Sequence, residues 1–234
     1  MKKKVLITGA SRGIGFEIAK NFLEAGFNVV GTRTTIKKHS PLDIDWIYGD
    51  FSNFKDIEDC SKRFKKFQPD ILINNAGINN INKFVKIDSD DFLKTHLVNV
   101  FAPFKFCQSV IPNMKLNKWG RIINISSIWG KIGKQYRASY MASKFALDGI
   151  TLAIAAEHTK DGILCNCLSP GFTNTELTRK NLNNKDISSI KKNIPIKRLA
   201  EPKEIAKFVF WLASEDNTYV SGQNIAIDGG YTRV

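Results

Sequence analysis

The sequence predicts an α/β protein built on a doubly wound, parallel, seven-stranded sheet. Short apolar runs alternate with longer helical patterns, which is typical of a parallel sheet covered by helices on both faces. A glycine-rich turn stands between the first run and the first helical pattern. With 234 residues, 43% of them hydrophobic, the chain can bury a sizeable core, and no linker, low-complexity tract or repeat divides it. We therefore expect one domain spanning residues 1–234.

The order of the elements follows from the apolar runs and the longer patterns between them. The runs predict strands at residues 4–8, 28–32, 45–48, 71–74, 121–126, 163–168 and 224–227. Helices are expected at residues 13–25, 54–67, 92–114, 140–160 and 202–213. In such sheets, ligands collect at the carboxyl ends of the strands.

Targeting, membrane and metal-binding features are missing from the sequence. The basic start is followed only by Val5, Leu6 and Ile7, which is too short for a signal-peptide core. No segment approaches the roughly 18 apolar residues of a membrane-spanning helix. The four cysteines lack metal-ligand spacing, so we expect no metal site. A cytoplasmic protein that does not enter a membrane is expected.

The first strand and helix are joined by a turn with phosphate-binding character. Gly9, Gly13 and Gly15 permit a sharp turn and a close approach of a ligand to the backbone, with Ser11, Arg12 and Ile14 between them. The amino terminus of the following helix offers unpaired N–H donors to an anion.

A tyrosine and a lysine share one helix face in the second half of the chain. Tyr140 and Lys144 are four residues apart, so the ammonium can lie beside the phenol. A phenol ordinarily has a pKa near 10, and a fixed cation lowers it toward the range of general acid and base catalysis. Ser127 lies thirteen residues before Tyr140.

The order of these motifs resembles the short-chain dehydrogenase/reductase family. Along the chain come the glycine-rich turn, Asn74-Asn75-Ala76-Gly77, Ser127, Tyr140 with Lys144, and Pro170-Gly171. The resemblance extends from Lys4 to about Gly230 and is strongest to the 3-oxoacyl-acyl carrier protein reductases. It implies a Rossmann-like fold and carbonyl reduction with a nicotinamide cofactor.

The resemblance assigns roles to the catalytic side chains. Tyr140 would donate a proton to the carbonyl oxygen, and Ser127 would hold that oxygen by a second hydrogen bond. Lys144 would lower the pKa of the tyrosine and bind the nicotinamide ribose.

The same resemblance assigns the remainder of the cofactor site. Asp50 and Phe51 would border adenine, and Asn75, Ala76 and Gly77 would line the adenosine ribose. The nicotinamide amide would be framed by residues that follow the sixth strand, namely Pro170, Gly171, Thr173 and Thr175.

The end of the second strand predicts which nicotinamide cofactor binds. An acidic residue there would hold both ribose hydroxyls of NAD, but this chain reads Gly31-Thr32-Arg33-Thr34, with no carboxylate before Asp43. Arg33 and Arg12 could pair with a 2′-phosphate, so we expect NADPH rather than NADH. The alternative is that Arg33 is only a surface cation.

One position departs from the family pattern. The family has an asparagine on the preceding long helix that anchors a water chain to the lysine; alignment on Leu97 and Phe101 puts His96 at that position. His96 could act as the water anchor or proton relay, since imidazole both donates and accepts hydrogen bonds. Alternatively, Asn99 takes the role after a local shift, or the relay is impaired.

The segment at residues 174–197 is polar and rich in lysine. By resemblance it is a mobile flap over the substrate; otherwise it is an ordinary surface excursion. In relatives the last helix and strand and two long central helices form dimers and tetramers, so we expect a homodimer or homotetramer. Phe208, Phe210 and Trp211 could serve that contact or the core.

The net charge of +13 leaves two interpretations. The basic residues are scattered, with modest clusters at 62–66 and 191–198, and no nucleic-acid-binding module is present. They form either a solvated surface or one that attracts an anionic partner, such as NADPH, a phosphorylated substrate or an acidic carrier protein. A nucleic-acid binder would show salt-dependent affinity.

The leading functional hypothesis is NADPH-dependent reduction of a ketone to a secondary alcohol, most specifically of a 3-oxoacyl-acyl carrier protein. A sugar or other small carbonyl compound is the alternative substrate, because the residues expected to line the pocket are bulky and polar. These are Trp129, Gln135, Tyr136 and Arg137. A nucleotide sensor without turnover is a further alternative.

Overall fold

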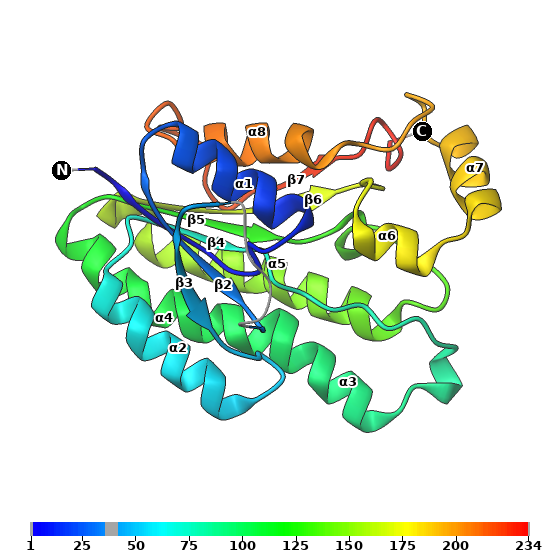
Figure 1. The fold of residues 1–234 in the computed structure, drawn as a ribbon, viewed down its shortest axis with the longest axis horizontal. Coiled ribbons are helices and arrows are strands. Elements are labelled where there is room, and N and C mark those ends of the chain that lie inside the picture. Colours follow the sequence, from blue (N-terminus) through cyan, green and yellow to red (C-terminus); the bar gives the residue numbers. More distant parts are fainter. Residues whose placement is uncertain (1, 36–41, 234) are drawn as a thin grey trace.

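Seven parallel strands form the central sheet of the computed structural model, which describes residues 2–35 and 42–233 (Figure 1). Their order is β3-β2-β1-β4-β5-β6-β7. The strands are β1 (Lys4–Ile7), β2 (Asn28–Arg33), β3 (Asp45–Tyr48), β4 (Ile71–Asn74), β5 (Gly120–Ile125), β6 (Ile163–Pro170) and β7 (Asn224–Ile227). The direction of winding reverses between β1 and β4, which is where a crevice opens in doubly wound sheets. The predicted fold class is confirmed.

Helices cover both faces of the sheet (Figure 1). One face carries α1 (Gly13–Glu24) and α8 (Pro202–Leu212). The other carries α2 (Phe54–Phe67), α4 (Ala102–Leu116) and α5 (Ala138–His158). The shorter α3 (Ser89–His96), α6 (Glu176–Asn181) and α7 (Asn184–Asn193) complete the helices named in Figure 1.

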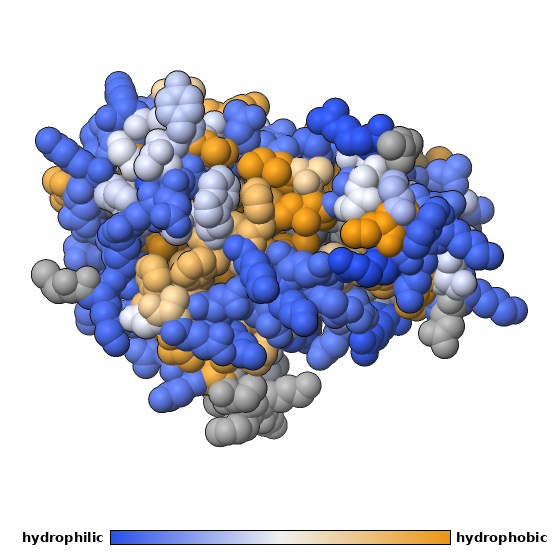
Figure 2. Space-filling model, turned by 90° about the horizontal axis from the view of Figure 1, so that it is seen from above, coloured by the Kyte–Doolittle hydropathy of each residue, from blue (hydrophilic) through white to orange (hydrophobic). Residues whose placement is uncertain are grey.

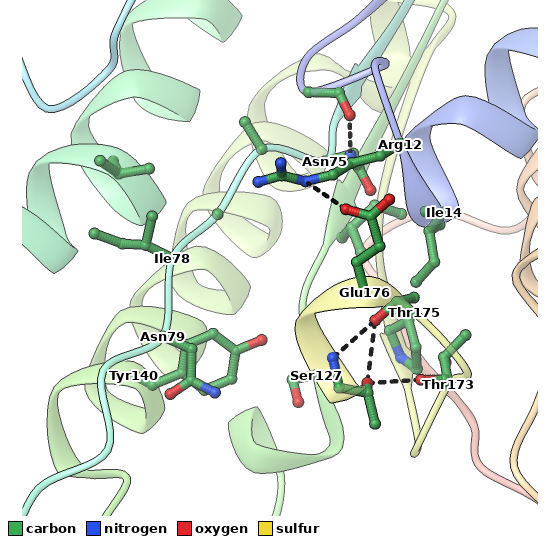
Figure 3. Close-up of a pocket in the computed structure, with 18 of the residues that line it drawn as sticks. Arg12, Ile14, Asn75, Ile78, Asn79, Ser127, Tyr140, Thr173, Thr175 and Glu176 are labelled. Carbon is green, nitrogen blue, oxygen red and sulfur yellow. Dashed lines mark hydrogen bonds and ion pairs between the residues drawn. The ribbon is translucent and has the colours of Figure 1, made fainter. Parts of the chain in front are cut away.

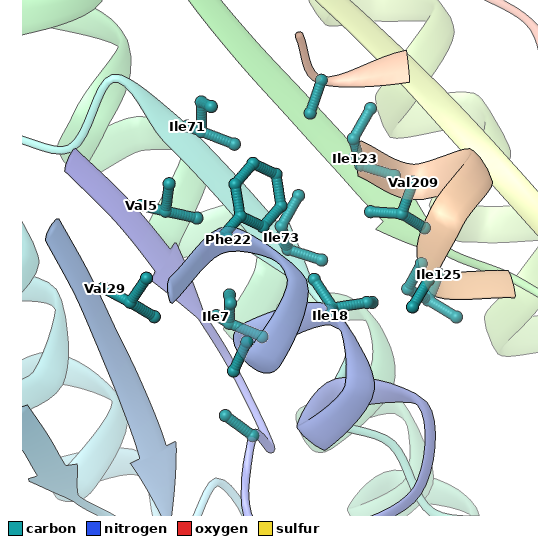
Figure 4. Packing of buried hydrophobic residues seen from close by; sticks show 14 of the residues in the cluster. Val5, Ile7, Ile18, Phe22, Val29, Ile71, Ile73, Ile123, Ile125 and Val209 are labelled. Atoms are coloured by element: carbon teal, nitrogen blue, oxygen red, sulfur yellow. The ribbon is translucent and has the colours of Figure 1, made fainter. Parts of the chain in front are cut away.

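Apolar side chains fill the space between the sheet and each helical layer. On the α1 side, Phe22 is fully buried, and it lies among Val5, Ile7 and Ile73 of the strands, with Val209 of α8 nearby (Figure 4). Burying each such side chain contributes about 1.5–3 kcal/mol. The central strands are buried on both faces, so their sequences are continuous apolar runs. This packing holds the carboxyl ends of the strands at fixed positions.

The helices differ from the prediction in two regions of the chain. The helix expected at residues 92–114 is divided into α3 and α4 by a π-helical turn, η2 (Leu97–Phe101). The segment at 174–197 holds α6 and α7, which its polar composition did not predict. The amino terminus of α7 is closed by a capping box, in which Asn183 accepts from the Asp186 amide and Asp186 accepts from the Asn183 amide.

Most of the molecular surface on the α1 and α8 side is hydrophilic, with an apolar strip in its middle (Figure 2). Within the described residues, no helix combines the length and apolar character needed to cross a bilayer. The same residues contain no group of three or more His, Cys, Asp or Glu side chains arranged to hold a metal ion.

Candidate active site

A cavity of about 840 Å³ opens at the carboxyl ends of the strands. It runs from the glycine-rich turn, past the ends of β2, β3 and β4, to the side chains predicted to be catalytic, after β5 and on α5, and to the loop after β6. Almost all the residues assigned to a site from the sequence line it: Gly9, Ser11, Arg12, Gly13, Ile14, Arg33, Thr34, Asp50, Phe51, Asn75, Ala76, Gly77, Ser127, Tyr140, Lys144, Pro170, Gly171, Thr173 and Thr175. Gly15 lies beneath the turn, and His96 lies elsewhere.

The glycine-rich turn is packed tightly against the end of β4. Gly9 has φ of 66°, and a Cβ there would lie 3.1 Å from the Ala76 Cα. A Cβ on Gly15 would collide with the Gly9 carbonyl oxygen and the Asn75 amide. The Asn75 Nδ2 donates to the carbonyls of Thr8 and Gly9 at 3.0 and 3.1 Å. Only glycine therefore allows the turn to approach β4 this closely.

The amino terminus of α1 faces the cavity beyond this turn (Figure 3). Its capping residue, Arg12, makes no side-chain hydrogen bond to the first turn. The backbone N–H groups in the first turn of α1 are therefore available to hydrogen-bond a ligand, and the helix dipole favours an anion at this end. The Arg12 Nε lies 4.0 Å from the Glu176 Oε2, an exposed pair that contributes little.

Arg33 is held at the cavity wall by two aromatic residues of β3. Its Nη2 donates to the Tyr48 hydroxyl at 2.6 Å, and its guanidinium lies 4.5 Å from the centre of the Trp46 ring. A cation over an aromatic face is attracted by the ring quadrupole. The Arg33 guanidinium is therefore held in place at the end of the cavity that adjoins β2 and β3.

The catalytic side chains meet where β5 and α5 approach each other. Ser127 follows β5, and hydrogen bonding from its side chain partly offsets the rise that burial causes in the pKa of Tyr140. Lys144 is 3% exposed; its Nζ donates to the Ile125 carbonyl at 2.7 Å and lies 5.4 Å from the Tyr140 ring centre. Figure 3 shows Ser127 and Tyr140 on either side of the same space.

The electrostatics differ from the sequence-based expectation. Burial raises the pKa of Tyr140 above its ordinary value, although Ser127 and the charge of Arg137 oppose this. Burial also lowers the pKa of Lys144 to about 8. A net lowering of the tyrosine pKa by Lys144 is therefore not seen in this structure, because desolvation is the larger effect and the ammonium is turned toward the Ile125 carbonyl.

Asn99, and not His96, lies beside the catalytic side chains. Asn99 is 1% exposed; its Oδ1 accepts from the Ile78 amide at 2.9 Å, and its Nδ2 donates to the Ile78 carbonyl at 2.9 Å and the Ser143 Oγ at 3.0 Å. A Cβ on Gly77 would lie 3.3 Å from the Asn99 Oδ1 and 3.7 Å from the Lys144 Nζ.

His96 is turned toward a separate groove. Its Nδ1 lies 3.0 Å from the Phe92 carbonyl, and its ring lies 4.2 Å from the Phe92 ring. The prediction that His96 occupies the position of the family's asparagine is wrong, because His96 does not line the cavity that contains Ser127, Tyr140 and Lys144. Alignment on Leu97 and Phe101 assumed regular α-helix, whereas the π-helical turn there inserts extra backbone and shifts the residues that face the site.

The substrate end of the cavity includes residues that the sequence identified only in part. Trp129 and Arg137 line it as expected, whereas Gln135 and Tyr136 do not. Asn79, Phe172, Thr178 and Leu182 also line it and were missed, because no local pattern marks them. The rings of Trp129 and Phe172 meet edge to face at 5.7 Å and form an apolar wall.

Comparisons with known proteins agree with this site. A family model described as enoyl-(acyl carrier protein) reductase matches residues 9–232. The 3-oxoacyl-acyl carrier protein reductase FabG of Buchnera aphidicola subsp. Schizaphis graminum is 36% identical over 237 residues, which cover 98% of this chain and 97% of that protein.

Two solved structures match over the full length of both chains. A 4-hydroxyisoleucine dehydrogenase complexed with NADH has a TM-score of 0.91 at 34% identity, with 100% of each chain covered. ElxO with NADP bound has a TM-score of 0.91 at 31% identity, with the same coverage. The chain belongs to the short-chain dehydrogenase/reductase family.

Proposed function

We propose that the chain is an NADPH-dependent reductase that converts the 3-oxo group of an acyl chain, carried as a thioester on acyl carrier protein, to a secondary alcohol. The observation that carries this proposal is the meeting of Ser127, Tyr140 and Lys144 in one cavity with the glycine-rich turn. The relative named as a 3-oxoacyl-acyl carrier protein reductase supports the choice of substrate.

The described residues fit a dinucleotide. The close packing of Gly9 and Gly15 leaves backbone exposed where a pyrophosphate would approach, and the uncapped start of α1 supplies donors. The fixed Arg33 guanidinium supports a 2′-phosphate, and hence NADPH. Asp50 and Phe51 would border the adenine, and Pro170, Gly171, Thr173 and Thr175 the nicotinamide.

A nicotinamide held in this cavity would supply the hydride that the carbonyl carbon needs. As the new C–H bond forms, the electron pair of the C=O bond moves to oxygen, and the Tyr140 hydroxyl gives its proton to that oxygen. Ser127 donates a second hydrogen bond to it. The Lys144 ammonium then stabilises the phenolate, which later regains a proton from solvent. Two oxygen-directed donors suit a carbonyl group better than a carbon–carbon double bond, which has no lone pairs to accept their hydrogen bonds.

We assign the family's asparagine role to Asn99 rather than to His96. The Asn99 side chain is hydrogen-bonded to the backbone of Ile78, in the loop after β4 that passes Lys144, and to the Ser143 Oγ. Its side chain is thus placed to order the part of the loop through which a proton would reach the lysine.

A small carbonyl substrate is the second candidate. The full-length structural match to 4-hydroxyisoleucine dehydrogenase favours it, since the name of that protein describes a small hydroxy compound. The same catalytic residues would serve either substrate, and the basic surface would matter only for the acidic carrier protein.

We further propose a cytoplasmic homotetramer or homodimer. Exposed apolar side chains gather near a groove between α3, α4 and α5, including Phe104, Phe145 and Leu152 at 40%, 49% and 54% exposure. By contrast, Phe208 and Phe210 pack against the α1 side of the core. A second copy would cover the exposed set.

The test is NADPH consumption with a 3-oxoacyl carrier protein thioester beside ketosugars and simple ketones. Preference for the thioester supports the proposal, and its turnover should fall as salt screens the basic surface. Preference for a small ketone would refute the carrier while keeping the chemistry. NADPH binding without turnover of any substrate would favour the nucleotide sensor.

A further inference from the structure

The substrate end of the cavity contains a cation that the catalytic mechanism does not use. Arg137 immediately precedes α5 and lines the cavity three residues before Tyr140. Its Nη1 is buried and has no hydrogen-bond partner among the described residues. Within those residues its guanidinium also has no ion pair with a carboxylate. A buried charged donor without an acceptor is costly, and arginine cannot shed its proton to avoid this cost.

The backbone holds Arg137 in place. Tyr136, just before it, has φ of 65°, which is uncommon for a residue other than glycine. The Tyr136 carbonyl accepts from the Asn82 amide at 3.1 Å, and the Arg137 carbonyl accepts from the Met141 amide at 2.7 Å. The loop after β4 and the first turn of α5 thus fix the backbone of Arg137 from both sides, so its side chain starts from a fixed position at the edge of the cavity.

The surroundings of Arg137 indicate what it would bind. The charge of Arg137 acts on the Tyr140 phenol, so the two groups lie close together. Asn79, which lines the same cavity as Tyr140, contributes a second buried polar atom without a partner among the described residues, its Oδ1. Trp129 and Phe172 supply an apolar wall to the same cavity. A ligand that carries an oxygen acceptor close to the ketone would satisfy the guanidinium.

We propose that Arg137 is a specificity-determining residue, whose Nη1 donates a hydrogen bond to the second oxygen of a 3-oxo substrate, the C1 oxygen. In a 3-oxoacyl group a single methylene separates the two carbonyl carbons. One carbonyl oxygen can therefore meet Tyr140 and Ser127 while the other meets Arg137. A simple ketone has no second oxygen and leaves the guanidinium unsatisfied, so the residue selects for 3-oxo compounds.

This inference rests on the proposed function and identifies the substrate group that the site recognises. The acceptor is either a thioester carbonyl or a free carboxylate. Both accept the same hydrogen bond, but only a carboxylate also pairs with the positive charge. The two sources are separated by replacing Arg137 with glutamine, which keeps a donor without the charge, and with lysine, which keeps both.

The experiment compares the wild type with Arg137→Met, Arg137→Gln and Arg137→Lys on a 3-oxoacyl thioester, on acetoacetate and on a simple ketone. Methionine keeps the aliphatic bulk but removes the donors. We expect kcat/KM for the better 3-oxo substrate to fall about ten- to hundredfold in Arg137→Met, with a clearly smaller fall for the simple ketone, which responds only to the lost charge beside the Tyr140 phenol. Restoration by glutamine would assign a neutral thioester, whereas restoration by lysine but not by glutamine would assign a carboxylate.

The matched control is Lys134→Met, which removes a cation of the same loop. The Lys134 Nζ lies 5.6 Å from the Trp129 ring centre, and the residue does not line the cavity. It should leave the preference for 3-oxo substrates unchanged. NADPH affinity and thermal unfolding establish that each variant is folded with its cofactor site intact.

The result that would overturn the inference is an equal loss on the simple ketone and the 3-oxo substrates, or no loss on either. An equal loss would mean that Arg137 acts only through the Tyr140 phenol, and it would be accompanied by a shifted pH profile for every substrate. If the wild type turns over no substrate, the proposed function fails separately. Binding of acetoacetate to the NADP-bound protein, with a tenfold or greater loss in Arg137→Met, would then still support the inference, and equal binding would refute it.

Discussion

Replacing Asn99 by alanine tests which residue of the interrupted helix supports the site. The side chain makes three hydrogen bonds, of 2.9, 2.9 and 3.0 Å, to the two backbone groups of Ile78 and to the Ser143 Oγ. At a net ~1 kcal/mol for each bond, their loss costs about 3 kcal/mol. The better helix propensity of alanine returns roughly 0.5 kcal/mol. A net loss of about 2.5 kcal/mol lowers the Tm by roughly 5–10 °C for a chain of this length.

The matched control is His96→Ala on the same stretch. The His96 ring lies against the carbonyl and ring of Phe92 and is partly exposed, so its removal should cost less than about 1 kcal/mol. Because Asn99 orders the loop beside Lys144, Asn99→Ala should also lower kcat by at least about tenfold, as expected when a positioning contact is lost.

The assays are thermal unfolding followed by circular dichroism and steady-state NADPH oxidation, with both variants measured side by side. A variant pair in which His96→Ala loses as much stability and activity as Asn99→Ala would refute the reasoning. Unchanged activity in Asn99→Ala, together with the expected drop in Tm, would leave Asn99 a purely structural residue. Rescue of kcat by Asn99→Ser, which keeps a short hydrogen-bonding side chain, would support the positioning role.

Three further predictions follow from the site. Tyr140→Phe should lower kcat about 10²- to 10⁴-fold while NADPH titration shows unchanged binding, and retained turnover would exclude Tyr140 as the proton donor. Burial lowers the pKa of Lys144 to about 8 and raises that of Tyr140, so the ammonium loses its charge first as the pH rises. The reductive kcat should therefore fall above about pH 8 in a pH profile, and Lys144→Arg, which stays charged, should not show this fall. Arg33→Ala should raise the KM for NADPH about ten- to hundredfold and leave the KM for NADH nearly unchanged, as expected if a charge-assisted bond to the 2′-phosphate is lost; equal changes for both cofactors would contradict the assignment.

Much of the fold could be predicted because its signals are local. The strands β3, β4 and β7 have the predicted bounds, since each is a short apolar run between polar segments. The interruption at Leu97–Phe101 could not be predicted, because neither proline nor glycine marks it. The bonds from Asn99 to Ile78 and Ser143 join segments distant in sequence, and only the packed structure brings them together.

Within the candidate site, residue identities were predictable, but the electrostatics were not. A sequence shows that a lysine lies four residues after a tyrosine; it does not show how deeply both are buried. Desolvation is the largest effect on both groups here, so both favour their neutral forms more than they do in water. Nor does a sequence show that the Arg137 Nη1 lacks a hydrogen-bond partner among the described residues, which becomes visible only in the folded cavity.

The two cations at the substrate end, Lys144 and Arg137, both lack a carboxylate partner among the described residues. The Lys144 Nζ donates to the Ile125 carbonyl, and Arg137 lacks an acidic partner within the described residues. A carboxylate beside either cation would neutralise it before any ligand arrived. Neither cation is paired with a carboxylate among the described residues, so the positive charge that each carries acts on the oxygen that gains electrons as the C=O bond is reduced and on the acceptor next to it. Because that negative charge develops only during the reaction, the stabilisation it receives is greater in the transition state than in the bound ketone, which is the condition for accelerating the chemical step.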